Sequence, residues 1–82
     1  MHDVYPNPVL DQASIDYDIR NEQIKAKVVI HNILGKPVGD YELRAFDTKT
    51  KISAEELPAG VYFYTLYING DNVFTRKLIV RK

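Results

Sequence analysis

The chain has 82 residues, of which 45% are hydrophobic, and its eleven basic side chains balance its eleven acidic ones. This length forms one small domain, and zero net charge provides no field that would attract nucleic acid or an anionic membrane surface. The absence of cysteine excludes disulfides, thiolate metal sites and a cysteine nucleophile, and no apolar run approaches the roughly 20 residues of a transmembrane helix.

The first distinctive segment is Val4-Tyr5-Pro6-Asn7-Pro8, in which two prolines flank an asparagine. Proline fixes its own φ and disfavours helix for the residue before it, so we predict an extended, rigid segment. Two interpretations stay open: an edge segment clamped onto the fold, or a recognition site for another protein. Because Met1 precedes residues that resemble the middle of a protein, we expect residues 1–82 to be a single domain taken from a longer chain.

Residues 13–20 and residues 24–31 both alternate apolar with polar side chains. A period of two is typical of a strand with one buried face. Because only the polar residues 21–23 separate the two segments, we predict that they pair as an antiparallel hairpin.

The middle of the chain is more polar. Residues 32–35 form a predicted turn, and Pro37, which lacks an N–H, indicates an edge strand or the start of a strand. The following strand carries on one face Tyr41, Leu43 and Ala45. Residues 47–51 are polar and are predicted to form a loop.

The last third of the chain gives the strongest strand signals. Residues 60–68 are bulky on both faces, which is typical of a central strand, and Asn69-Gly70 is a strong hairpin signal because both residues tolerate positive φ. Residues 73–81 return as a final strand, expected at a sheet edge. No helical period of ten residues occurs, so the sequence predicts an all-β fold, an antiparallel β-sandwich of about seven strands.

Gly60 stands two residues before Tyr62, at the start of the long strand. This spacing matches a tyrosine corner, in which the phenol hydroxyl bonds to backbone upstream in the chain. A crossing between sheets leaves backbone groups unpaired, and a buried hydroxyl can satisfy one of them. We therefore interpret Tyr62 as structural.

Residues with catalytic or metal-binding chemistry are few and scattered. His2 lies near the terminus and His31 closes a strand on its solvent side, and neither has the neighbours that a metal site needs. Asp16 and Asp18 share a strand face but lack the loop of a calcium site. The serines have no glycine elbow and no local base. We therefore expect no enzyme, no cofactor and no metal.

Four blocks in order along the chain resemble the C-terminal sorting domain, type A, of the type IX secretion system of Gram-negative bacteria. The blocks are residues 5–8 (YPNP), 28–38, 57–64 and 77–82. Their motif residues are Tyr5, Pro6, Asn7, Pro8, Gly35, Lys36, Leu57, Gly60, Tyr62 and Tyr64. Each block alone has low specificity, and the order of all four carries the likeness.

The resemblance implies an Ig-like β-sandwich that acts as a non-catalytic secretion signal. It implies a covalently linked N-terminal cargo that passes through the periplasm and across the outer membrane, to the cell surface or beyond. It implies two partners, the secretion machinery and a sortase-like surface peptidase that removes the domain. In the family the final segment carries most of the signal, so the expected recognition residues are Lys77, Leu78, Ile79, Val80, Arg81 and Lys82.

The charges at the end of the chain fit that expectation. Four cations stand in or beside the last strand: Arg76, Lys77, Arg81 and Lys82. Such a strand is either a solvated sheet edge or a docking site that a partner binds by edge pairing or through the basic side chains. Gly60 and Tyr62 would shape the surface presented, and pairing between the edges of two copies stays open.

An alternative is an Ig-like or fibronectin-like binding or adhesion module of a secreted enzyme. This function needs exposed aromatic side chains gathered on one face, and the candidates are Tyr41, Phe63 and Tyr67. Their burial would favour the sorting signal instead.

Overall fold

The computed structural model describes residues 4–81. Within this range the chain forms strands and no helix, which confirms the predicted all-β fold. The strands number six rather than about seven: β1 (Gln12–Asp16), β2 (Ala26–His31), β3 (Pro37–Leu43), β4 (Lys49–Ser53), β5 (Gly60–Ile68) and β6 (Asp71–Val80).

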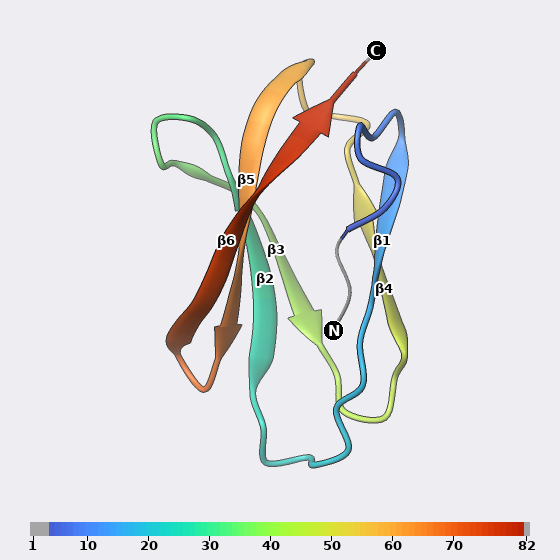
Figure 1. Ribbon diagram of the computed structural model, residues 1–82, viewed down its shortest axis with the longest axis vertical. Coiled ribbons are helices and arrows are strands. Elements are labelled where there is room, and N and C mark those ends of the chain that lie inside the picture. The colour runs from blue at the N-terminus through green and yellow to red at the C-terminus, as the bar shows by residue number, and fades with distance from the viewer. Residues whose placement is uncertain (1–3, 82) are drawn as a thin grey trace.

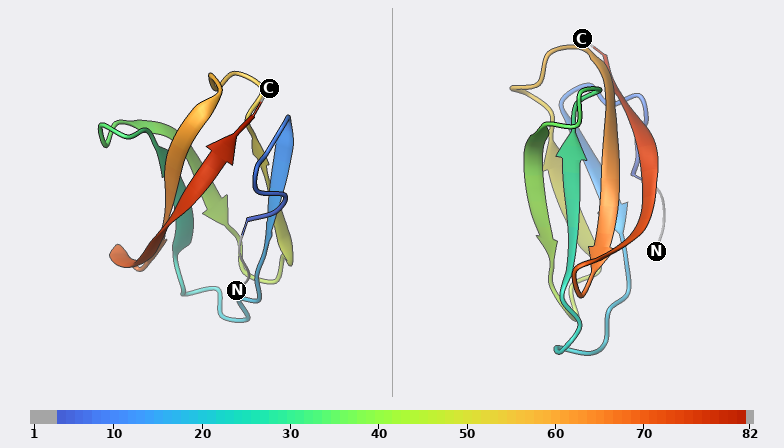
Figure 2. Two further views of the ribbon diagram at one scale, coloured as in Figure 1. Left: turned by 45° about the horizontal axis from the view of Figure 1, so that its top comes forward. Right: turned by 90° about the vertical axis from the view of Figure 1, so that its left-hand side faces the viewer.

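The strands form two antiparallel sheets arranged as a sandwich (Figure 1, Figure 2). One sheet pairs β1 with β4, and the other has the order β3-β2-β5-β6. The bulky faces of β5 correctly predicted its central place, and the final strand β6 lies at the edge of the larger sheet as expected.

The predicted hairpin between residues 13–20 and 24–31 is wrong. β1 ends at Asp16 and pairs with β4, whereas β2 begins at Ala26 and pairs with β3 and β5. The connection between β1 and β2 crosses from one sheet to the other and buries Tyr17 and Ile19 on the way. Alternation reports burial on one side, and it does not distinguish a hairpin from a crossing between sheets.

The loop predicted at residues 47–51 is also wrong in part, because β4 begins at Lys49. Within this strand only Ile52 is fully buried, and its two lysines are exposed. A short strand of this kind at the margin of a sheet needs few apolar residues, so composition gave no strand signal.

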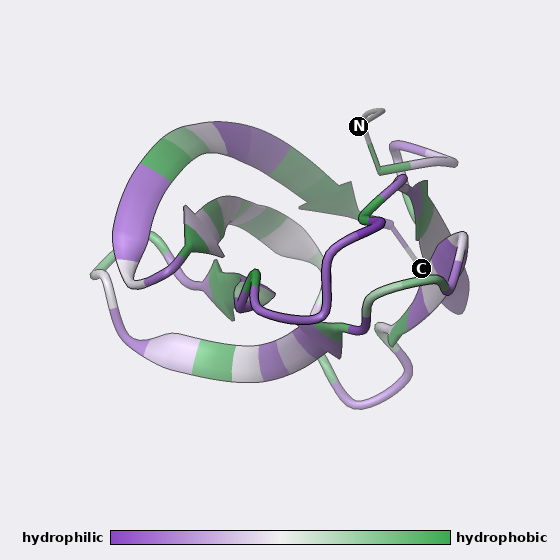
Figure 3. Cartoon of the chain, turned by 90° about the horizontal axis from the view of Figure 1, so that it is seen from below, coloured by the Kyte–Doolittle hydropathy of each residue, from purple (hydrophilic) through white to green (hydrophobic). Residues whose placement is uncertain are grey.

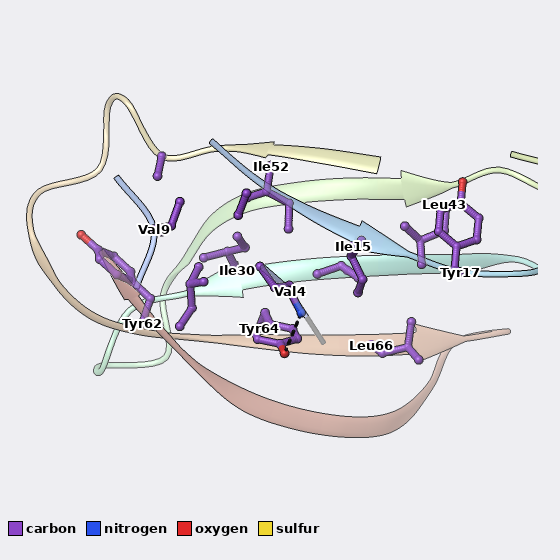
Figure 4. Close-up of a cluster of buried hydrophobic side chains, with 14 of the residues drawn as sticks. Val4, Val9, Ile15, Tyr17, Ile30, Leu43, Ile52, Tyr62, Tyr64 and Leu66 are labelled. Carbon is purple, nitrogen blue, oxygen red and sulfur yellow. Dashed lines mark hydrogen bonds between the residues drawn. The ribbon is translucent and has the colours of Figure 1, made fainter. Parts of the chain in front are cut away.

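The core lies between the two sheets (Figure 4). Its largest fully buried side chains include one from each strand, in chain order Ile15, Ile30, Leu43, Ile52, Tyr64 and Leu78. Every strand therefore contributes to a single core, and the loss of any one strand would expose the others' apolar faces to water.

The β5–β6 hairpin forms at the predicted place. Asn69 and Gly70 join the strands with φ values of 52° and 86°, in the left-handed region that asparagine and glycine tolerate best. The register shifts once, between Leu66 and Tyr67, which places a bulge near the hairpin end of β6.

The predicted tyrosine corner is confirmed. The Tyr62 hydroxyl donates a hydrogen bond of 2.6 Å to the Pro58 carbonyl, four residues upstream, and the Tyr62 side chain is buried. Gly60 lies between them with a φ of 156°. The bond fixes the chain where it enters β5 and starts the long hairpin that ends in β6.

One side of the sandwich, between β3 and β4, is closed by Tyr41. The Ser53 N–H donates to the Tyr41 hydroxyl at 3.2 Å, and that hydroxyl donates to the Ser53 carbonyl at 3.4 Å. Gly39 makes room for the ring, since a Cβ there would stand 3.2 Å from the Tyr41 Cε2 atom. Seen along the long axis, the strands surround one interior (Figure 3).

Candidate functional site

The six predicted recognition residues divide into core and surface. Leu78 and Val80 point into the core and are 0% and 2% exposed, and Ile79 is half-buried. Lys77 and Arg81 are exposed, and Lys82 lies outside the described residues. In the folded domain, the polar surface of this segment within the described range therefore consists of Lys77 and Arg81.

The outer edge of this segment is paired with the N-terminal segment of residues 4–9, here called the lead-in. Val9 and Val80 form a parallel bridge. The Val9 N–H donates to the Ile79 carbonyl at 2.7 Å, and the Arg81 N–H donates to the Val9 carbonyl at 2.9 Å. One residue of the lead-in thus completes one rung of a parallel ladder beside β6.

Asn7 adds a second rung with its side chain. Its Nδ2 donates to the Lys77 carbonyl at 3.0 Å, and its Oδ1 accepts from the Ile79 N–H at 3.0 Å. A primary amide carries the same donor and acceptor as a peptide group, so Asn7 replaces the backbone of a neighbouring strand. The prolines on either side of it have no N–H to offer, which leaves this part of the ladder to the side chain.

The other half of the lead-in binds the smaller sheet. Tyr5 and Ser14 exchange backbone hydrogen bonds of 2.8 and 2.7 Å, and the Tyr5 hydroxyl donates to the Asp16 carboxylate at 3.0 Å. The Val4 N–H donates to the hydroxyl of Tyr64 at 3.3 Å. Val4 and Val9 are both buried, so the lead-in joins β1 to β6 across the second open side of the sandwich (Figure 1).

The contacts of the lead-in show its structural role, and they also show that the outer edge of residues 77–81 is occupied rather than free for a partner. Of the two interpretations left open for the YPNP block, the clamp is the one that the contacts show. The lead-in binds four of the outward-facing backbone groups of the closing segment, namely the carbonyls of Lys77 and Ile79 and the N–H groups of Ile79 and Arg81. A partner that pairs with these same four groups has to displace the lead-in.

The remaining motif residues shape turns and the core. Gly35 has a φ of 85° in the β2–β3 turn, and the N–H groups of Leu34 and Lys36 both donate to the Asn32 side chain. Leu57 packs against the core and Tyr64 belongs to it. Lys36 is exposed.

Of the residues first considered for catalysis or metal binding, His31 and Asp18 have structural contacts, and His2 lies outside the described residues. His31 is half-buried, stacks on Phe63 and lies 3.1 Å, through Nε2, from the Thr65 hydroxyl. Asp18 pairs with Arg20 at 3.0 Å on the surface. Among residues 4–81, no three His, Cys, Asp or Glu side chains gather as metal ligands would.

The aromatic patch required by a binding module does not form. Tyr41 lies on the inner side of its sheet, bonded to Ser53, and Phe63 and Tyr67 are half-buried on the outer side. Tyr67 has the Lys27 ammonium 5.7 Å from its ring centroid. The three rings therefore do not make one flat exposed surface.

Sequence reasoning missed the role of Asn7 as a strand substitute. Its partners Lys77 and Ile79 are 70 and 72 residues away, so no local pattern reports the contact. The flanking prolines were the available signal, because they mark a segment that must satisfy a sheet edge without its own N–H groups.

Comparison with known proteins gives one match. A family model described as "Secretion system C-terminal sorting domain" matches residues 3–81, nearly the whole chain. No curated protein and no solved structure matches. The part of the chain that the structure describes contains no helix long and apolar enough to cross a membrane.

Proposed function

Since the chain belongs to the family of C-terminal sorting domains of the type IX secretion system, we propose that residues 1–82 are the sorting domain of a longer protein, read by the secretion machinery through Lys77, Arg81 and Lys82. The family is a secretion signal, and its cargo is an exported protein of the outer membrane or the extracellular space. This chain would direct its cargo there.

The exposure of Lys77 and Arg81 carries the proposal. Both side chains reach solvent from a segment whose backbone is bonded on one side to β5 and on the other to the lead-in. The backbone that carries them is therefore fixed by the fold rather than by the partner, which lowers the backbone entropy lost on binding. Charged groups held in this way are suited to acidic side chains on another protein.

Two steps around recognition belong to the same proposal. The cargo folds in the periplasm before the outer membrane is crossed, and a sortase-like peptidase at the surface then cuts the chain upstream of the sandwich. Val4 is buried, so a cut upstream of it would leave the core of the sandwich intact. The domain itself has no catalytic role in the proposal.

The test is a reporter with an inner-membrane export leader at its front and this chain at its back, expressed in a bacterium with a type IX system. The variant Lys77→Gln/Arg81→Gln/Lys82→Gln removes the proposed contacts and keeps the core. We expect its surface-exposed fraction to fall about tenfold or more, as loss of charge-assisted contacts predicts.

The control variant Lys25→Gln/Arg44→Gln/Lys51→Gln removes the same charges from exposed positions elsewhere. It should be exported like the wild type. Equal export of both variants, with wild-type circular dichroism, would show that the machinery does not read these cations.

A further inference from the structure

The edge that the lead-in covers is a complete template for an added strand. Its outward groups alternate carbonyl and N–H from Lys77 to Arg81, and the lead-in fills them with one backbone rung at Val9 and one side-chain rung at Asn7. Sheet edges with this alternation bind extended polypeptide.

We propose that the partner of this domain adds an extended segment to the outer edge of β6 over Lys77–Arg81, in place of lead-in residues 7–9. The proposal rests on the function proposed above and says how the machinery would engage the same segment. It makes the lead-in an exchangeable strand, and it makes the paired edge seen here the resting state of the signal.

The lead-in makes a weak strand compared with what the edge can accept. Pro6 and Pro8 have no N–H, so it forms no regular ladder, and Tyr5, Pro6 and Asn7 are exposed. Within the part of the chain that the structure describes, the backbone of the lead-in forms no hydrogen bond with β6 residues that precede Ile79. By contrast, β6 pairs with β5 along its whole length, from Gly60 to Ile68. A regular strand could bond the same four groups and continue towards Thr75, whose backbone shares the outward orientation of Lys77 and Ile79.

The surroundings of the edge define the chemistry of the incoming segment. Val9 is 0% exposed and belongs to the core between the sheets (Figure 4), so the segment needs a small β-branched apolar side chain there. The exposed cations Lys77 and Arg81 flank this place on the edge, so carboxylates on the incoming segment next to its buried residue would be electrostatically favourable. The occupant is thus an acidic extended segment of another protein with one buried valine-like residue.

An engineered disulfide, here called a staple, tests whether the lead-in must leave the edge of β6. Because the chain has no cysteine of its own, the two introduced cysteines have no other partner within it. In Val9→Cys/Val80→Cys the two bridge partners are joined and residues 7–9 cannot leave β6. The matched control Tyr5→Cys/Ser14→Cys joins the lead-in to β1 at its other bridge and leaves the β6 edge free to open. Each double variant is compared with its single-cysteine parents in the reporter fusion.

We expect the Val9–Val80 staple to lower surface export about tenfold or more, while the control staple and the single variants are exported like the wild type. Export of the Val9–Val80 staple at the wild-type level would overturn the proposal. If the wild-type fusion itself stays in the periplasm, the proposed function fails and this inference fails with it. A dimer of the purified chain that the staple abolishes would identify a second copy as the occupant and would also overturn it.

Amide hydrogen exchange on the purified chain tests the opening without any partner. The N–H groups of Ile79 and Arg81 face the lead-in, whereas those of Leu78 and Val80 face β5. If the lead-in opens by itself, Ile79 and Arg81 should exchange at least about tenfold faster than Leu78 and Val80. Equal protection of the four amides would show that the lead-in opens only with the whole sandwich, which contradicts the proposal.

Discussion

At three places in this small domain, a single polar side chain forms the hydrogen bond to a backbone group that another strand would otherwise form. Asn7 completes the edge of β6, Tyr62 satisfies the carbonyl of Pro58, and Tyr41 binds the backbone of Ser53. Each stands where the chain changes sheet or where the two sheets meet, and regular pairing leaves polar groups unbonded at such places.

Removing the Tyr62 hydroxyl should cost more than removing that of Tyr41. The Tyr62 bond is short, 2.6 Å, and partly buried, so Tyr62→Phe should destabilise the domain by about 1–2 kcal/mol. The Tyr41 bonds are exposed and 3.2–3.4 Å long, so Tyr41→Phe should cost less than about 0.5 kcal/mol. Urea unfolding followed by circular dichroism measures both losses of unfolding free energy. A larger loss for Tyr41→Phe than for Tyr62→Phe would contradict the prediction that the tyrosine corner contributes more to stability.

Asn7→Ala should destabilise the domain because it leaves the Lys77 carbonyl and the Ile79 N–H without their partner. These groups can turn to water, so the expected loss is about 1 kcal/mol rather than the full penalty of a buried group. Asn72→Ala, at an exposed site in β6, is the control and should change the unfolding free energy by less than about 0.5 kcal/mol. If the two variants unfold at the same urea concentration, Asn7 does not act as a strand substitute.

At the scale of elements, local signals predicted local structure. Asn69-Gly70 fixed the β5–β6 hairpin, and the spacing of Gly60 and Tyr62 fixed the corner, because each depends on residues close in sequence. The pairing of β1 with β4 escaped prediction since its partners lie far apart along the chain, from Gln12 with Ser53 to Asp16 with Lys49. The closing segment was correctly placed at an edge, but the cover over that edge depends on contacts across the whole chain.

Deleting residues 77–82 should unfold the domain rather than merely remove a signal. The deletion takes away Leu78 and Val80, which are buried, and Leu78 alone should contribute about 2–5 kcal/mol by comparison with Leu→Ala changes in cores. That loss is a large part of the stability expected for a chain of this size, about 4–12 kcal/mol. A truncated chain with wild-type circular dichroism and a cooperative thermal transition would show that the last strand is not part of the core.

At the scale of the whole molecule, the two ends of the described chain form one unit. The lead-in binds β6 through Asn7 and Val9 and binds β1 through Tyr5, so the first and last described segments close the sandwich together. In the proposed function, a cargo joined upstream of the lead-in would enter the domain next to the segment that the machinery is proposed to read. A folded sandwich with zero net charge is suited to act as a tag, because it provides no long-range field that would attract it to nucleic acid or membranes.

The central claim is that these 82 residues suffice as a type IX sorting signal. The most direct measurement is the surface-exposed fraction of a reporter that carries an inner-membrane export leader and this chain, in paired strains with and without the secretion system. The account predicts reporter at the cell surface only in the strain that has the system, and in the periplasm of the other. Retention in the periplasm of both strains, with the sandwich folded, would contradict it.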